Sequence, residues 1–90
     1  MKTIRRTTQY KKDFKKYKHQ PDKIHSLLKV IRVLENDVEL PEKYRKHPLK
    51  GKYQGCFECH IDGNFLLIWI DEENNIIELV RLGSHSELFD

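Results

Sequence analysis

The sequence predicts an α+β fold in which an N-terminal helical hairpin packs on a small antiparallel sheet. In the first third of the chain, apolar residues recur at helical spacing, whereas in the last third short apolar runs alternate with turn residues. The length of 90 residues suits a single domain, 1–90, and leaves no room for a second. Apolar residues make up 38% of the chain and charged residues 34%, which is typical of a globular protein rather than a disordered one.

The chain is expected to open with a short strand, Thr3 to Arg6, followed by a first helix. Thr7 or Thr8 is a suitable N-cap for that helix, because a threonine hydroxyl can accept a hydrogen bond from a free N–H of the first turn. The apolar stripe of the helix has members at i, i+4 and i+7, namely Tyr10, Phe14 and Tyr17.

A second helix is expected after a short connection near His19 and Gln20. Pro21 suits its first turn, where the missing N–H costs little, and Asn36-Asp37 is a reasonable end. Between them, apolar residues repeat at helical spacing: Ile24, Leu27, Leu28, Ile31 and Leu34. Two short helices joined this closely should pack as a hairpin.

Residues 40–55 show neither the helical nor the strand period, and they are interpreted as a long ordered loop. Loops of this length inside a compact domain are usually functional. This loop is also basic, since it contains Lys43, Arg45, Lys46, Lys50 and Lys52.

Three strands are predicted in the rest of the chain: Phe57–Ile61, Phe65–Ile70 and Ile76–Leu82. The separating segments, 62–64 and 71–75, are rich in Asp, Asn and Gly, so consecutive antiparallel hairpins are expected. The middle strand is apolar at both odd and even positions, which indicates that both of its faces are covered. Ser84 to Phe89 should form a short terminal turn or helix.

Positive charge is concentrated in the first 52 residues, which hold 16 Lys and Arg against six Asp and Glu. The remainder holds one basic residue, Arg81, against eight acidic residues. This segregation suits either a solvated lysine-rich surface or a face that attracts a polyanion, most commonly nucleic acid. The longest apolar run is too short to span a bilayer and the opening residues do not resemble a signal peptide, so no membrane association and a cytoplasmic location are expected.

Cys56, Cys59 and His60 match the C-x-x-C-H pattern of haem attachment, and they also suggest a zinc site. Haem attachment normally needs export. In an extended strand, residues 56 and 59 face opposite sides, which disfavours a shared metal. We therefore interpret at least one cysteine as a reduced core residue.

Three histidines are better candidates for chemistry. His47 lies in the basic loop, His60 at the end of one predicted strand and His85 just after another, with Arg81 nearby. In a meander the first and third strands end at the same edge of the sheet, so all three histidines are expected to converge there. His19 and His25 lie on or beside the helices and are interpreted as surface residues.

Metal-free cleavage of RNA needs groups of this kind. A base takes the proton of the ribose 2′-OH, an acid protonates the leaving 5′ oxygen, and a cation offsets the charge that develops on phosphorus. Histidine suits the first two roles because its ordinary pKa of about 6.5 lets it act in either direction. Arginine suits the third because its fork can bind phosphate through two hydrogen bonds.

Three sequence blocks resemble the YafQ-like branch of the RelE superfamily of bacterial type II toxins. They are the HPLKG block at 47–51, the GCFECH block at 55–60 and the RLGSHSELF block at 81–89, and their order covers essentially the whole chain. The resemblance implies a fold like that of microbial ribonucleases and cleavage of messenger RNA in the ribosomal A site. It also implies neutralisation by a cognate antitoxin, with which the toxin forms a complex that binds operator DNA.

Carried over by position, His47, His60 and His85 match the active-site histidines of the family, Phe89 its active-site aromatic and Arg81 its phosphate-binding arginine. Two departures stand out. Asn64 occupies the position of a usual aspartate and is unable to act as a base. Cys56-Phe57 replaces an aromatic–Arg pair, for which the loop lysines could compensate as substrate-binding residues: Lys46, Lys50 and Lys52.

The leading hypothesis is thus a ribosome-dependent endoribonuclease that needs neither metal nor cofactor. The main alternative is a non-catalytic RNA- or ribosome-binding protein, for which the basic first half and Asn64 are the reasons. A gyrase-poisoning toxin on the same fold is less compatible with the histidines.

Overall fold

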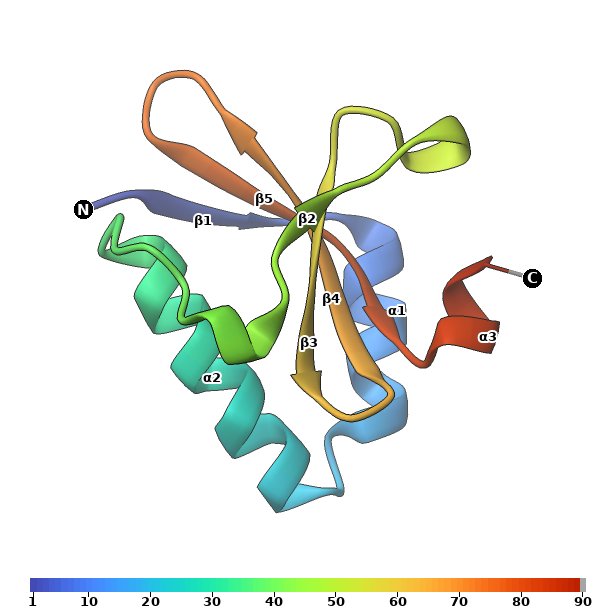
Figure 1. Cartoon of the computed structure of the whole chain (residues 1–90). Coiled ribbons are helices and arrows are strands. Elements are labelled where there is room, and N and C mark those ends of the chain that lie inside the picture. The colour runs from blue at the N-terminus through green and yellow to red at the C-terminus, as the bar shows by residue number, and fades with distance from the viewer. Residues whose placement is uncertain (90) are drawn as a thin grey trace.

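The computed structural model describes residues 1–89, so Asp90, the last residue of the predicted domain, lies outside the described residues. Figure 1 shows how the elements follow one another along the chain. They are β1 (Thr3–Arg6), α1 (Thr8–Tyr17), α2 (Pro21–Glu35), the 3₁₀ helix η1 (Glu42–Tyr44), β2 (His47–Pro48), the 3₁₀ helix η2 (Gly51–Tyr53), β3 (Phe57–Asp62), β4 (Phe65–Glu72), β5 (Ile76–Gly83) and α3 (His85–Phe89).

The five strands form one sheet in the order β1-β5-β4-β3-β2. The three long strands form the predicted antiparallel meander, in which His60 pairs with Leu66 and Leu66 with Gly83. The expected antiparallel sheet is nevertheless wrong in one respect, because β1 pairs with β5 in parallel, Thr3 opposite Ile76. The sheet is therefore mixed, and the first and last strands of the chain are neighbours.

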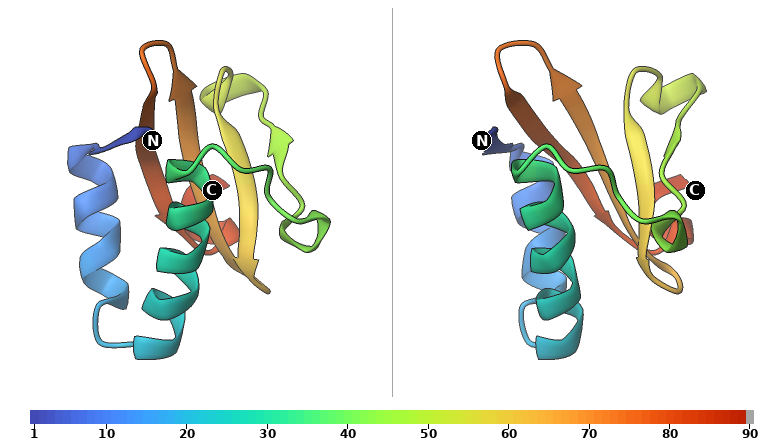
Figure 2. Two further views of the ribbon diagram at one scale, coloured as in Figure 1. Left: turned by 90° about the vertical axis from the view of Figure 1, so that its left-hand side faces the viewer. Right: turned by 60° about the vertical axis from the view of Figure 1, so that its left-hand side comes forward.

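Both long helices lie on the same side of the sheet, α1 mainly against β5 and α2 against β3 (Figure 2). Helix α1 begins as expected, since the Thr7 hydroxyl accepts a hydrogen bond of 3.0 Å from the Tyr10 N–H. Pro21 opens α2, and Asn36 caps its end. Within residues 1–89 there is no helix long and apolar enough to cross a membrane.

The side chains of the sheet divide between two apolar clusters, one on each face. Odd-numbered residues of β3 and β4, such as Cys59 and Trp69, pack under the two long helices. Leu66 and Ile68 face the other way and pack with Tyr53, Cys56 and Leu88. On that second face, called the open face below, η2 contributes Tyr53 and α3 contributes Leu88, while His60 of β3 is half-buried.

The interpretation of residues 40–55 as a loop is wrong in part. The segment contains η1, η2 and the two-residue strand β2, which pairs with β3 so that His47 lies opposite Glu58. A strand of two residues is too short to show an alternating pattern, and only its pairing with β3 defines it. This pairing brings the basic segment to the edge of the open face.

Candidate active site

The pairing of the strands brings the three predicted histidines toward one end of the open face. His47 is on β2 at the sheet edge, and His60 lies near the end of β3. Because His60, Leu66 and Gly83 are in register across β3, β4 and β5, His85 follows β5 at the level where β3 ends. The ring centroids of His47 and His60 are 6.3 Å apart.

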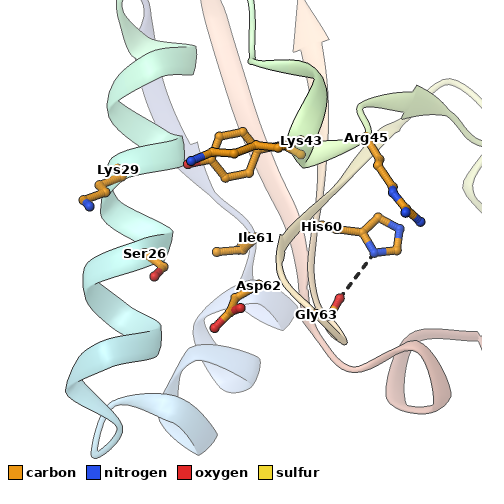
Figure 3. Close-up of a pocket in the computed structure, with 9 residues that line it drawn as sticks. Ser26, Lys29, Lys43, Arg45, His60, Ile61, Asp62 and Gly63 are labelled. Atoms are coloured by element: carbon orange, nitrogen blue, oxygen red, sulfur yellow. Dashed lines mark hydrogen bonds between the residues drawn. The ribbon is translucent and has the colours of Figure 1, made fainter.

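The two rings of this pair are held by backbone carbonyls. His47 donates its Nδ1–H to the carbonyl oxygen of Arg45 at 2.8 Å. His60 donates its Nδ1–H to the carbonyl of Gly63 at 3.3 Å (Figure 3). A ring that donates from Nδ1 keeps Nε2 for another partner, which for His47 is the carboxylate of Glu58.

Glu58 is a functional candidate that the sequence reasoning missed. Its side chain is only 5% exposed, and its Oε1 lies 3.2 Å from His47 Nε2. Its other oxygen, Oε2, is buried without a hydrogen-bond partner among the described residues. The sequence contains a pattern that predicts this placement, because residues 58 and 60 of one strand point to the same face of the sheet. A buried carboxylate that contacts a histidine and has one oxygen without a partner is a candidate for a functional role.

Asn64 links the β3–β4 turn to the start of α3. Its side-chain oxygen accepts a hydrogen bond of 2.9 Å from the backbone N–H of His85. The residue that stands in place of the usual aspartate therefore fixes the position of His85.

The start of helix α3 is also held by a capping box between Ser84 and Glu87. The Ser84 N–H donates to Glu87 Oε1 at 2.8 Å, and the Glu87 N–H donates back to the Ser84 hydroxyl at 3.3 Å. Tyr17 of α1 also donates its hydroxyl to Glu87. The Ser84 N–H, followed by the Tyr17 hydroxyl, lowers the pKa of Glu87 to about 2. These contacts attach the short helix to the rest of the domain.

Phe89 lies against His85, and Tyr53 lies against Phe89. The ring centroids of His85 and Phe89 are 4.8 Å apart with the planes tilted by 36°, and Phe89 meets Tyr53 edge to face at 5.6 Å. Tyr53 donates its hydroxyl to the Leu88 carbonyl at 3.1 Å. Phe89 thus lies where the sequence placed it, whereas Tyr53 was missed because an aromatic residue in a basic loop carries no local signal.

Arg81 reaches the site, but its hydrogen-bonding groups are largely occupied. Its Nε and Nη2 donate to Asp13 of α1 at 2.7 and 3.2 Å, and its Nη1 donates to the Tyr53 hydroxyl at 3.0 Å. The hydrogen bond to Asp13, which is only 1% exposed, raises the pKa of Arg81 above its ordinary value. The two-pronged edge expected to bind phosphate faces Asp13 in this structure.

The three predicted substrate-binding lysines are not gathered together. Lys52 lies with its Nζ 5.2 Å from the ring centre of Tyr53, beside the site. Lys46 lies 4.6 Å from the ring centre of Phe57, which packs with the helix-side core, so Lys46 faces away from the histidines. Lys50 is exposed.

The zinc and haem hypotheses fail on the placement of the cysteines. Cys59 lies under the long helices, and Cys56 lies in the cluster on the opposite face. Burial raises the pKa of the Cys59 thiol to about 12, which makes it a poor metal ligand. In the part of the chain that the structure describes, no three His, Cys, Asp or Glu side chains are grouped as a metal would need. His19 and His25 are exposed, as expected.

Comparison with known proteins relates this chain to YafQ toxins, both by a family match and by a curated relative. Residues 2–90 match the family described as "Bacterial toxin of type II toxin-antitoxin system, YafQ". The mRNA interferase toxin YafQ of Escherichia coli K12 is 29% identical over 82 residues, which are 90% of this chain and 88% of the relative.

Two solved structures show the same fold. A metal-bound toxin from Helicobacter pylori has a TM-score of 0.89 and 39% identity, with 99% of this chain and 100% of that chain covered. The E. coli DinJ–YafQ complex has a TM-score of 0.85 and 25% identity, with both chains covered in full.

Proposed function

Because the chain belongs to the YafQ family of bacterial type II toxins, we propose that it cleaves messenger RNA at its three histidines. The proposal is supported by the 6.3 Å separation of the His47 and His60 rings, and by the hydrogen bond that ties the His85 N–H to Asn64 in the turn after β3. The E. coli relative is named an mRNA interferase, which supports the same reaction here. The protein would act in the cytoplasm, on messenger RNA in the ribosomal A site.

The chemistry needs only side chains of this site. A histidine removes the proton of the ribose 2′-OH, and the 2′ oxygen forms a bond to the adjacent phosphorus. The bond from phosphorus to the 5′ oxygen breaks, and a second histidine protonates that oxygen. The products are a 2′,3′-cyclic phosphate and a 5′-hydroxyl end. Each positioned acid or base contributes about 10²- to 10⁴-fold to the rate.

We assign His85 as the principal acid–base residue, with His60 and His47 as its partners. His85 is exposed, and its position is fixed by Asn64 and Phe89. Buried Glu58 would orient His47, a positioning role in this proposal. Arg81, whose fork is engaged with Asp13, would contribute its positive charge at the site, and Lys50 and Lys52 would bind flanking phosphates.

The partner of such a toxin is a cognate antitoxin. The crystallised E. coli relative is bound to DinJ, and we propose an equivalent antitoxin for this chain, with a complex that binds operator DNA. Co-expression with the neighbouring open reading frame, followed by size-exclusion chromatography and an operator shift assay, tests both points.

The decisive experiment compares purified wild-type protein with His85→Ala on translating ribosomes. The 5′ ends of the messenger are mapped by primer extension, in magnesium buffer with a chelator selective for zinc and iron. New ends with the wild type alone would establish histidine-dependent cleavage that needs neither of these metals. Equal cleavage by both proteins would refute the histidine assignment.

A second candidate function is translation inhibition by binding without cleavage. Two observations favour it: Asn64 cannot act as a base, and the fork of Arg81 is occupied. It predicts arrested translation, salt-sensitive ribosome binding and no new RNA ends with either protein.

A further inference from the structure

The occupied fork of Arg81 leaves the site in need of another phosphate ligand. Charge on a transferring phosphoryl group is best offset by a cation that reaches it directly. Lys46 faces the helix side of the sheet, and Lys52 lies against Tyr53. Because Lys50 and Lys52 bind flanking phosphates in the proposed function, the scissile phosphate calls for a further cation beside the histidines.

Arg45 lies two residues before His47, and hydrogen bonds hold its backbone on both sides. Its N–H donates to the Glu42 carbonyl at 2.9 Å, and its own carbonyl accepts the His47 Nδ1–H at 2.8 Å. The backbone between these bonds has φ 53° and ψ 46°, the left-handed conformation. Arg45 thus ends η1, and its carbonyl oxygen holds the ring of His47.

An arginine in this conformation is unusual. The left-handed region is favoured by glycine and asparagine, and long side chains adopt it at a cost that surrounding structure must offset. Such residues concentrate at functional sites. With the backbone in this conformation, the Arg45 side chain extends toward the ring of His60, as Figure 3 shows.

The guanidinium of Arg45 is exposed and available. Arg45 and His60 both line a cavity of about 590 Å³ between α2, η1 and the β3–β4 turn. In the described part of the chain Arg45 takes part in no ion pair, in contrast to Arg81, which is paired with Asp13. Its planar fork can therefore be offered to a ligand at the histidine pair.

We propose that Arg45 binds the scissile phosphate, its fork donating to the two non-bridging oxygens while the neighbouring histidines exchange protons with the 2′ and 5′ oxygens. This assignment rests on the proposed function and gives the phosphate-binding role to Arg45 rather than to Arg81. Both are arginines, but only Arg45 has a free two-pronged edge.

Two substitutions test the fork without disturbing the backbone. Arg45→Asn keeps a residue that tolerates the left-handed conformation but removes the cation, and Arg45→Lys keeps the charge without the fork. The matched control is Arg6→Gln, which removes an exposed arginine of β1 outside the site. Urea unfolding of each variant verifies that the fold is retained.

The readout is single-turnover cleavage of messenger RNA on ribosomes at saturating protein. Arg45→Asn is expected to lose about 100-fold in rate, as for removal of one transition-state donor, with Arg45→Lys in between and Arg6→Gln unchanged. A phosphorothioate at the scissile position should slow the wild type but leave Arg45→Asn little affected. Cleavage by Arg45→Asn at the wild-type rate would overturn the assignment.

A binding experiment separates this proposal from the proposed function. Inorganic phosphate is titrated into ¹⁵N-labelled protein, and the Arg45 Nε–H and His60 ring resonances are followed. If the wild type cuts no RNA but phosphate shifts these resonances in a way that Arg45→Asn abolishes, the nuclease proposal fails and the phosphate site stands. If phosphate leaves both resonances unchanged, the site assignment fails, whatever the nuclease result.

Discussion

Replacing Asp13 with alanine is expected to destabilise the protein by about 3 to 5 kcal/mol, the range for removing one partner of a buried ion pair. Asp13 is 1% exposed and accepts hydrogen bonds from Arg81 Nε and Nη2, from the Leu82 N–H and from the Gln9 side chain. Without the carboxylate, the buried Leu82 N–H has no acceptor, which alone costs about 1 to 3 kcal/mol. The guanidinium, 17% exposed, loses its counter-charge as well.

For a chain of this length, 1 kcal/mol corresponds to roughly 4 to 8 °C in Tm, so a loss of at least about 12 °C is expected. Urea unfolding followed by tryptophan fluorescence is a direct assay, because Trp69 is fully buried. Glu73→Ala serves as the control, since Glu73 is exposed and its loss should change stability by no more than about 0.5 kcal/mol.

A double-mutant cycle attributes the loss to the pair itself. Arg81→Ala removes the cation that Asp13→Ala leaves uncompensated, so the double variant should be more stable than the sum of the single losses predicts, by about 1 to 3 kcal/mol. A single-variant loss below about 1 kcal/mol, or strictly additive losses, would refute the inference that this pair joins α1 to β5.

Three further predictions concern other buried or paired groups. Glu58→Met should raise stability by about 1 kcal/mol, because it removes the unpartnered Oε2, and should lower cleavage at least tenfold; a destabilised but fully active variant would contradict both roles. Glu87, whose pKa is lowered to about 2 from 4.5, stabilises the fold above about pH 4.5, and this contribution is lost as pH falls toward 2. Stability measured from pH 6 to pH 2 should therefore fall less steeply in Glu87→Gln, and parallel curves would count against the capping box. Cys59, with its pKa raised to about 12 by burial, should resist iodoacetamide at pH 8 until guanidinium unfolds the chain; mass spectrometry showing alkylation of the native protein would disprove its burial.

The helices and the meander could be predicted because their signals are local. Thr7 as N-cap, Pro21 in the first turn of α2 and the opening strand Thr3–Arg6 were each identified from a few neighbouring residues, and all three are confirmed. The parallel pairing of that strand with β5 was not predicted. It joins positions 3 and 76, and no local pattern carries the direction of so distant a contact.

The same distinction applies to the site. His60 and His85 were expected near one another because the first and third strands of a meander end at the same edge, and His47 because the basic loop leads into that sheet. The pairing of Arg81 with Asp13 depends on how α1 lies over the sheet, so the sequence suggested a free fork where the structure has an occupied one. The alternation of side chains along a strand places Glu58 on the same face as His60, but its burial against His47 depends on the pairing of β2 with β3.

The parallel contact between β1 and β5 also affects biosynthesis. The opening strand has no partner until residues 76–79 have been translated, and His85 follows a few residues later. Consequently the sheet gains its fifth strand only after residues 76–79 have been synthesised, and a product interrupted before them leaves the opening strand unpaired.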